Sequence, residues 1–194
     1  MSDWWDDLES EAKPPSQVRG EELFLRSLRF MREILETVVP AIIIALLINL
    51  FMAQATRVYG QSMEPSLHTN QRLIVEKVSY HLHPPKRGDV VVLKLHDEHS
   101  ELLIKRIIGL PGEIVEIKNG AVYVNGKPLK EPYLNQRTRG QMAAQVIPPL
   151  HVFVLGDNRG FSNDSRSFGM VAFADIVGRA WLSYWPLEKL GLVF

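Results

Sequence analysis

The sequence has 194 residues, which is enough for one folded domain with a modest additional lobe. Its 22 basic and 22 acidic residues balance, so the chain has no global positive field that would attract nucleic acid. It contains no cysteine, which excludes disulfides, thiolate zinc sites and a cysteine nucleophile. Any nucleophile in this chain must therefore be an oxygen or an amine.

A charge-free apolar run covers residues 37–56. As a helix it would be about 30 Å long, which matches the hydrocarbon core of a bilayer. We therefore expect one transmembrane helix over residues 34–56, with Pro40 in the first turn of the apolar run, where a missing N–H costs little. A buried core helix and a cleavable signal peptide are the alternatives, since Ala53-Gln54-Ala55 has the small-x-small pattern of a cleavage site. The long acidic segment before the run favours an uncleaved anchor.

Basic residues flank the apolar run unequally. Three arginines precede it and one follows closely: Arg26, Arg29, Arg32 and Arg57. Because basic residues accumulate on the cytoplasmic side of membrane helices, this asymmetry predicts a cytoplasmic N-terminus and an extracytoplasmic segment at residues 57–194. Residues 1–33 would then form a cytoplasmic tail, unstructured to about residue 22, and a juxtamembrane helix.

The part of the chain after residue 57 has the pattern of a β protein. Short runs rich in β-branched residues alternate with turn residues. The expected strands are residues 72–78, 89–95, 101–108, 114–118, 121–124, 152–155 and 176–184. Asn119-Gly120 and Asn125-Gly126 suit tight hairpin turns. The sequence therefore predicts a mainly β domain, with a hairpin-rich subdomain inserted at about residues 113–150.

Two residues of this domain have the chemistry of a nucleophile and its base. Ser62 lies in Tyr59-Gly-Gln-Ser62-Met-Glu-Pro-Ser-Leu67, between a glycine and a proline, which also suits a plain turn. Lys105 lies in an expected strand, on the same face as Leu103 and Ile107. Desolvation by such neighbours would destabilise the ammonium ion, and a neutral amine can accept a proton from a serine hydroxyl. A lysine that extends into solvent from a strand edge is the alternative.

A dense polar segment follows the expected strand at residues 152–155. It reads Gly156-Asp-Asn-Arg159-Gly-Phe-Ser162-Asn-Asp164-Ser-Arg166-Ser-Phe-Gly169. Ser162 can hold a lysine amine in position, and the acidic and basic side chains can form ion pairs that stiffen the loop. A calcium loop is the alternative, but the arginines oppose a dication and no bidentate glutamate follows at the required spacing.

Taken in this order, the three segments resemble the motifs of the bacterial type I signal peptidases, and the resemblance covers nearly all of residues 57–180. The matching motifs are Ser62-Met-Glu-Pro-Ser-Leu67, Arg87-Gly-Asp-Val-Val-Val92, Lys105-Arg-Ile-Ile-Gly-Leu-Pro-Gly112, and Gly156-Asp-Asn-Arg with Ser162, Asp164, Ser165 and Arg166. The resemblance implies a mainly β fold, namely an antiparallel β-sheet catalytic domain of the signal peptidase and LexA-like type, with the inserted β-hairpin subdomain.

The resemblance also implies a serine endopeptidase that uses a Ser/Lys dyad and needs no metal or cofactor. Ser62 would be the nucleophile, Lys105 the general base, and Ser162 the hydroxyl that orients the lysine. Four charged residues would support the site structurally without carrying protons: Arg106, Asp157, Asp164 and Arg166.

The substrate pocket and the oxyanion hole follow less directly from the resemblance. By similarity the candidate pocket walls are Val58, Met63, Leu103 and Ile104, which would look no different as plain core residues. Some relatives carry a serine where this chain has Gly60, and its hydroxyl helps to hold the oxyanion. The backbone N–H of Ser62 is the donor that remains.

The implied partners are secretory preproteins, which would bind as an extended strand and be cut after small residues. The plasma membrane would hold the single-pass chain, the secretion translocon is a candidate partner, and nucleic acid is not expected. Trp181, Tyr184 and Trp185 form an aromatic face at the membrane interface or else pack in the core. Two other functions stay open: a LexA-like self-cleaving repressor, and an inactive membrane-bound scaffold that binds peptides without cutting them.

Overall fold

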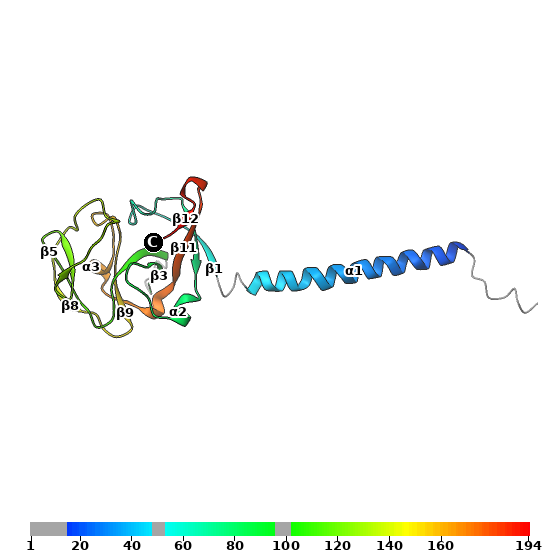
Figure 1. The fold of residues 1–194 in the computed structure, drawn as a ribbon, viewed down its shortest axis with the longest axis horizontal. Coiled ribbons are helices and arrows are strands. Elements are labelled where there is room, and N and C mark those ends of the chain that lie inside the picture. The colour runs from blue at the N-terminus through cyan, green and yellow to red at the C-terminus, as the bar shows by residue number, and fades with distance from the viewer. Residues whose placement is uncertain (1–14, 48–52, 96–101) are drawn as a thin grey trace, which may run out of the picture. The chain divides into compact units, whose positions relative to one another are not determined.

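The computed structural model describes residues 15–47, 53–95 and 102–194. The chain separates into two compact units, Met1–Ile48 and Asn49–Phe194. Figure 1 shows the helix α1 of the first unit and the strands of the second. The first part of the expected tail, the segment 48–52 of the apolar run and the start of the strand expected at residue 101 lie outside the described residues.

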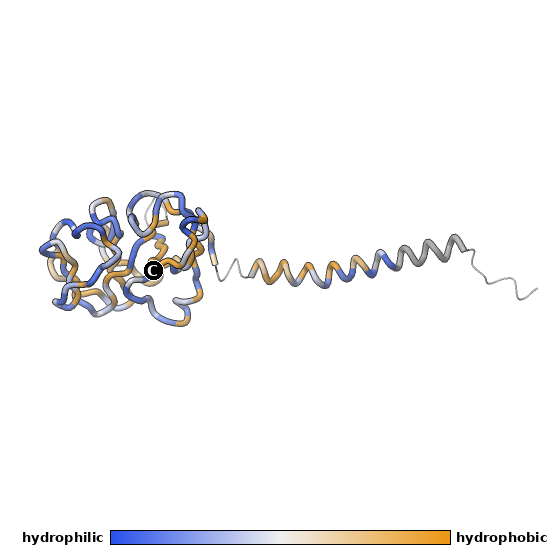
Figure 2. Tube along the Cα trace, turned by 45° about the horizontal axis from the view of Figure 1, so that its top comes forward, coloured by the Kyte–Doolittle hydropathy of each residue, from blue (hydrophilic) through white to orange (hydrophobic). Residues whose placement is uncertain are grey.

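Helix α1, Pro15–Leu47, is the described part of the first unit. Our expectation of an unstructured segment to about residue 22 is wrong from residue 15 onward, because adding a turn to an existing helix costs far less than starting one. Pro40 does not lie in the first turn of a helix. It lies inside α1, and its ring removes one N–H from the hydrogen bonds of the helix there. Figure 2 shows hydrophilic residues in the earlier coloured turns of α1 and hydrophobic residues in the later turns. Of the helices in the described residues, none combines the length and the apolar content needed to span a bilayer.

The second unit begins, as far as it is described, with strand β1, Ala53–Arg57. It pairs antiparallel with β2, Arg72–Glu76. The expected end of the transmembrane span at residue 56 is therefore wrong, because residues 53–56 belong to this strand pair. Ala55 is paired with Ile74, so cleavage of the chain after Ala55 requires the edge of the sheet to open.

Eight antiparallel strands form the first sheet, in the order β1-β2-β11-β3-β4-β9-β10, with β12 paired to β11. The further strands are β3 (Val90–Lys94), β4 (Leu102–Gly109), β9 (His151–Leu155), β10 (Val171–Ala172), β11 (Ile176–Trp185) and β12 (Gly191–Leu192). Short helices join them: α2 (Ser79–Leu82), α3 (Ser165–Phe168), η3 (Phe173–Asp175) and η4 (Leu187–Lys189). Strand β4 lies between β3 and β9, which places Lys105, opposite Val91, inside the sheet rather than at its edge.

A second sheet lies between β4 and β9 in the sequence, in the order β7-β6-β5-β8. Its strands are β5 (Ile114–Lys118), β6 (Ala121–Val124), β7 (Lys127–Pro128) and β8 (Met142–Val146). Both expected hairpin turns are confirmed. Asn119 and Gly120 have φ values of 53° and 79°, and Asn125 and Gly126 have 52° and 75°, the left-handed pairs that suit two-residue turns. Figure 1 shows β5 and β8 at the opposite end of this unit from β1 and β11.

The two sheets share one hydrophobic cluster. It contains Ile117 and Val122 of the second sheet together with Phe153 and Leu155 of β9. Gly109, at the end of β4, lies where they meet, and a Cβ added there would come within 2.4 Å of the Ile147 side chain. The glycine therefore permits the close approach of the two sheets.

The mainly β prediction is confirmed. The seven predicted strands correspond, within a few residues, to β2, β3, β4, β5, β6, β9 and β11. Strands β1, β7, β8, β10 and β12 were not predicted.

Candidate active site

Ser62 and Lys105 lie in direct contact in the second unit. Ser62 belongs to the loop between β1 and β2, and Lys105 to the middle of β4. Lys105 Nζ donates a hydrogen bond to Ser62 Oγ across 2.9 Å and another to the carbonyl oxygen of Ile104 across 3.1 Å. Lys105 is 2% exposed, so the alternative of a lysine that extends into solvent is wrong.

Burial is the largest influence on the Lys105 amine. It lowers the pKa of Lys105 from 10.5 to about 8, because an ammonium ion loses its hydration when it leaves water. The negative charges of Asp164 and Asp157 oppose this shift and raise the pKa. With a pKa of about 8, roughly a tenth of the amines are neutral at pH 7, against a negligible fraction for an exposed lysine. The contact therefore joins a hydroxyl to an amine that can accept its proton.

The loop that carries Ser62 is fixed to the sheet and to the core. The Val58 N–H donates to the Gln71 carbonyl across 2.8 Å, which closes the base of the loop. Met63 and Leu67 are 1% and 3% exposed and pack in one hydrophobic cluster. Because the residue after Ser62 is buried in this way, the serine backbone has little freedom to move.

Arg106, the neighbour of Lys105 on β4, forms a buried ion pair with Asp157. Its Nε lies 2.8 Å from Asp157 Oδ1, and a terminal nitrogen lies 2.6 Å from Oδ2. The guanidinium also donates to the Gly88 carbonyl across 2.9 Å and stacks on the Tyr133 ring at 4.1 Å. Such a two-point pair holds the start of the loop after β9 against β4.

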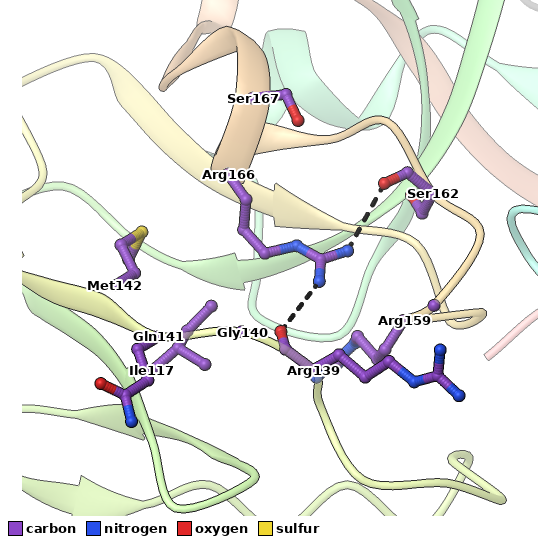
Figure 3. A pocket seen from close by; sticks show the side chains of 10 residues that line it. Ile117, Arg139, Gly140, Gln141, Met142, Arg159, Ser162, Arg166 and Ser167 are labelled. Carbon is purple, nitrogen blue, oxygen red and sulfur yellow. Dashed lines mark hydrogen bonds between the residues drawn. The ribbon is translucent and has the colours of Figure 1, made fainter.

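Asp164 and Arg166 form a second pair in the same loop. Arg166 Nε lies 2.8 Å from Asp164 Oδ1, and the Gly156 N–H donates to Asp164 Oδ2 across 3.1 Å. Burial acts to raise the pKa of Asp164, but the bonds from Arg166 and Gly156 outweigh it and lower the pKa overall. In Figure 3, Arg166 also reaches the carbonyl oxygens of Ser162 and Arg139.

The chain matches known proteins over most of its length. Residues 31–185 match the family model described as signal peptidase, peptidase S26. The chain belongs to this signal peptidase family. A signal peptidase I of Leptolyngbya laminosa is 40% identical over 83% of this chain and 83% of its own, and a probable signal peptidase I-2 of Synechocystis sp. is 42% identical over 83% and 76%. A solved signal peptidase I of Enterococcus faecalis is 33% identical, covering 50% of this chain and 97% of its own, with a TM-score of 0.45.

Membership of the signal peptidase family makes the chain a serine endopeptidase.

Three of its four candidate pocket residues come together, since Val58, Met63 and Ile104 pack in one hydrophobic cluster. Leu103 does not join them, because it points to the other face of β4 and packs against a different cluster. A hollow of about 350 Å³ beside Ile104 is lined by residues that sequence reasoning missed: Thr56, Arg57, Tyr59 and Leu102.

Ser162 lies close to Ser62 in this signal peptidase family member but makes no hydrogen bond to Lys105. Its Oγ is buried and makes no hydrogen bond of good geometry among the described residues, but it lies close enough to Asp164 to help lower the pKa of that carboxyl. A Cβ added to Gly156 would come within 2.2 Å of Ser162 Oγ and 2.4 Å of the Ser62 carbonyl oxygen. Gly156 thus allows the two serines to approach each other, a requirement that the sequence analysis missed.

A third buried ion pair, between Arg159 and Glu131, also escaped prediction. The Arg159 guanidinium is fully buried, hydrogen-bonds Glu131 and Thr138, and donates through Nε to the Gly156 carbonyl across 3.0 Å. Glu131 and Thr138 belong to the long connection between β7 and β8. The inserted segment therefore braces the loop that follows β9.

The buried Arg106–Asp157 pair is tested by Asp157→Ala. The substitution leaves the guanidinium of Arg106 buried and unpaired, so the free energy of unfolding should fall by about 3–5 kcal/mol in denaturant titrations. Glu116→Ala, which removes a partly exposed pair with Lys118, is the control and should leave the unfolding midpoint nearly unchanged. Equal stability of the two variants would contradict a supporting role for Asp157.

Proposed function

We propose that this chain is a type I signal peptidase that removes signal peptides from exported preproteins by cutting after small residues. Ser62 is the nucleophile and Lys105 the general base. The observation that carries the proposal is the 2.9 Å contact between Ser62 Oγ and a buried lysine amine, in a chain of the signal peptidase family.

The first half of the proposed reaction forms an acyl-enzyme. Neutral Lys105 Nζ takes the proton of Ser62 Oγ as the oxygen attacks the carbonyl carbon of the scissile peptide bond. The resulting ammonium returns the proton to the leaving amine, which departs as the new N-terminus of the mature protein. In the second half, Lys105 takes a proton from water as the water oxygen attacks the ester carbonyl carbon. The ester C–O bond then breaks, the Lys105 ammonium returns the proton to Ser62 Oγ, and the signal peptide leaves with a free carboxyl end.

Ser162 is assigned the role of holding the Lys105 amine. Ser162 Oγ is buried near the Ser62 carbonyl oxygen with only Asp164 close to it and no hydrogen bond of good geometry, which is uncommon for a buried hydroxyl. The ammonium that forms on Lys105 during the reaction has three N–H donors and would supply the missing partner. The cluster of Val58, Met63 and Ile104 would form a shallow wall that admits only small side chains before the cut.

The membrane anchor is also a proposal. The charge-free residues 37–47 at the end of α1 would lie in the hydrocarbon core of the bilayer. Ile42, Ile43 and Ile44 of α1 are each at least 50% exposed, a distribution that water disfavours and lipid accepts. Trp181 and Trp185 are 45% and 50% exposed on β11, which suits a contact with the membrane interface. The bias in arginines favours a cytoplasmic N-terminus and a second unit outside the cell membrane.

The dyad is tested by replacing each member separately. Ser62→Ala and Lys105→Ala should each abolish cleavage of a preprotein with alanines before the cut, because one removes the attacking oxygen and the other the base. Lys94→Ala, which removes an exposed lysine from the neighbouring strand β3, is the control and should cleave normally. Thermal unfolding of all three would check the fold, and full activity in either dyad variant would overturn the assignment.

The pH dependence follows from the lowered pKa of Lys105. The neutral amine is the active form, so kcat/KM should rise about tenfold per pH unit at low pH and level off above the pKa of about 8. Measurement of kcat/KM between pH 6 and 10 checks this. If kcat/KM instead rose with a midpoint near the ordinary pKa of an exposed lysine, Lys105 would not be desolvated in the working enzyme.

The anchor is tested in cells that express the full chain. The protein should stay in the membrane pellet after alkaline extraction, and protease added to spheroplasts should degrade residues 57–194 while sparing the N-terminal segment. Recovery of the full chain in the soluble fraction would contradict the anchor, and protection of the second unit in spheroplasts would contradict the orientation.

A further inference from the structure

Asn158, in the loop after β9, makes two hydrogen bonds to the nucleophile loop, the residues between β1 and β2 that include Ser62. It is 8% exposed, and its backbone N–H donates to the Ser62 carbonyl oxygen across 3.0 Å. Its side-chain Nδ2 donates to the Gln61 carbonyl oxygen across 3.1 Å. One residue thus holds the carbonyls of two consecutive peptide groups on either side of the Ser62 Cα.

The Gln61 carbonyl and the Ser62 N–H belong to the same planar peptide group, in which they point in opposite directions. A bond that fixes the carbonyl therefore also fixes the direction of the N–H. The Ser62 N–H has no hydrogen-bond acceptor among the described residues, whereas the carbonyl accepts from both Asn158 Nδ2 and the Glu64 N–H. A free donor on a clamped peptide is what stabilisation of a developing oxyanion requires.

The two hydrogen bonds from Asn158 matter because the residue two positions before Ser62 is a glycine, which allows the backbone more conformations than other residues do. Gly60 has a φ of 77°, a conformation that glycine adopts without strain, and no atom lies within 4 Å of the position of its missing Cβ. No side chain of its own and no close packing limit the backbone at Gly60, and the Thr69 hydroxyl restrains the peptide group that follows it by donating to the Gly60 carbonyl oxygen across 2.8 Å. Asn158 supplies a restraint from outside the loop.

The orientation of the Asn158 amide is set in turn by the inserted segment. Gln136 Nε2 donates to Asn158 Oδ1 across 2.9 Å. Because this bond requires the oxygen of the amide, the NH₂ group must face Gln61. Gln136 lies in the connection between β7 and β8, so the insertion reaches the nucleophile through Gln136 and Asn158.

We propose that Asn158 is a positioning residue that aims the Ser62 N–H at the oxyanion of the tetrahedral intermediate, with Gln136 holding its amide in the required orientation. This inference rests on the proposed function. It adds a role for the inserted segment in stabilising the transition state, separate from the proton transfer between Ser62 and Lys105.

Asn158→Ala and Asn158→Asp test the proposal in the full chain. Both remove the Nδ2 donor, and the aspartate keeps the size of the side chain. We expect kcat to fall about tenfold in each, which is the size of one lost hydrogen bond in the transition state, with KM within about twofold of wild type. Gln136→Leu should lower kcat by a smaller factor, and Asn135→Ala, an exposed neighbour of Gln136, should be unchanged.

A pair of ligands separates positioning from a purely structural effect. A substrate-derived peptide aldehyde, which forms a tetrahedral adduct with Ser62, should bind the Asn158 variants about tenfold less tightly, whereas the same peptide ending in an amide should bind equally well. The low-pH limb of kcat/KM should keep its midpoint in Asn158→Ala, because the dyad is intact and no charge is added. If the wild type cleaves normally, two results would overturn the role of Asn158 alone: an unchanged kcat in the Asn158 variants, or an equal loss of affinity for both peptides. Failure of the wild type to cleave would overturn the proposed function as well.

Discussion

An amine kept out of water beside a hydroxyl is the feature on which the rest of the second unit depends. Lys105 can be buried because β4 lies inside the sheet between β3 and β9, where Lys105 pairs with Val91 of β3 and is 2% exposed. Ser62 can reach it because Met63 and Leu67 anchor the loop after β1 in the core. The core of the sheet and the reactivity of the lysine are thus produced by the same packing.

Two carboxylates close to the lysine would undo this effect if they were free. Asp157 and Asp164 both raise the pKa of Lys105, and an unpaired carboxylate nearby would stabilise the ammonium further. Each is instead bonded at two points to an arginine, Asp157 to Arg106 and Asp164 to Arg166. The arginines offset the carboxylate charges, while the carboxylates hold the loop in place. The ion pairs therefore limit how far the two carboxylates raise the pKa of Lys105, and they also hold its surroundings in place.

The sequence predicted the strands that are rich in β-branched residues and the two Asn-Gly turns, because those signals are local. It missed β8, because residues Met142–Val146 include two alanines and a glutamine, which have little preference for strands. It also extended the expected membrane helix to residue 56, because the pairing of β1 with β2 leaves no local signal in the sequence. The resemblance of the motifs suggested Ser62 and Lys105, but no periodicity joins residues so far apart in the chain. Asn158, Gln136, Glu131 and Gly156 were not singled out, since their roles arise only from contacts between the insertion, the loop after β9 and the nucleophile loop.

Direct titration of the Lys105 amine tests the central claim most closely. Nuclear magnetic resonance of protein labelled at lysine side chains can follow the Nζ and Cε signals of Lys105, assigned by their loss in Lys105→Ala, as the pH is raised. The account predicts a midpoint near pH 8, well below those of the exposed lysines. A midpoint near the ordinary value of 10.5 would mean that the amine is solvated and charged at working pH, and would contradict it.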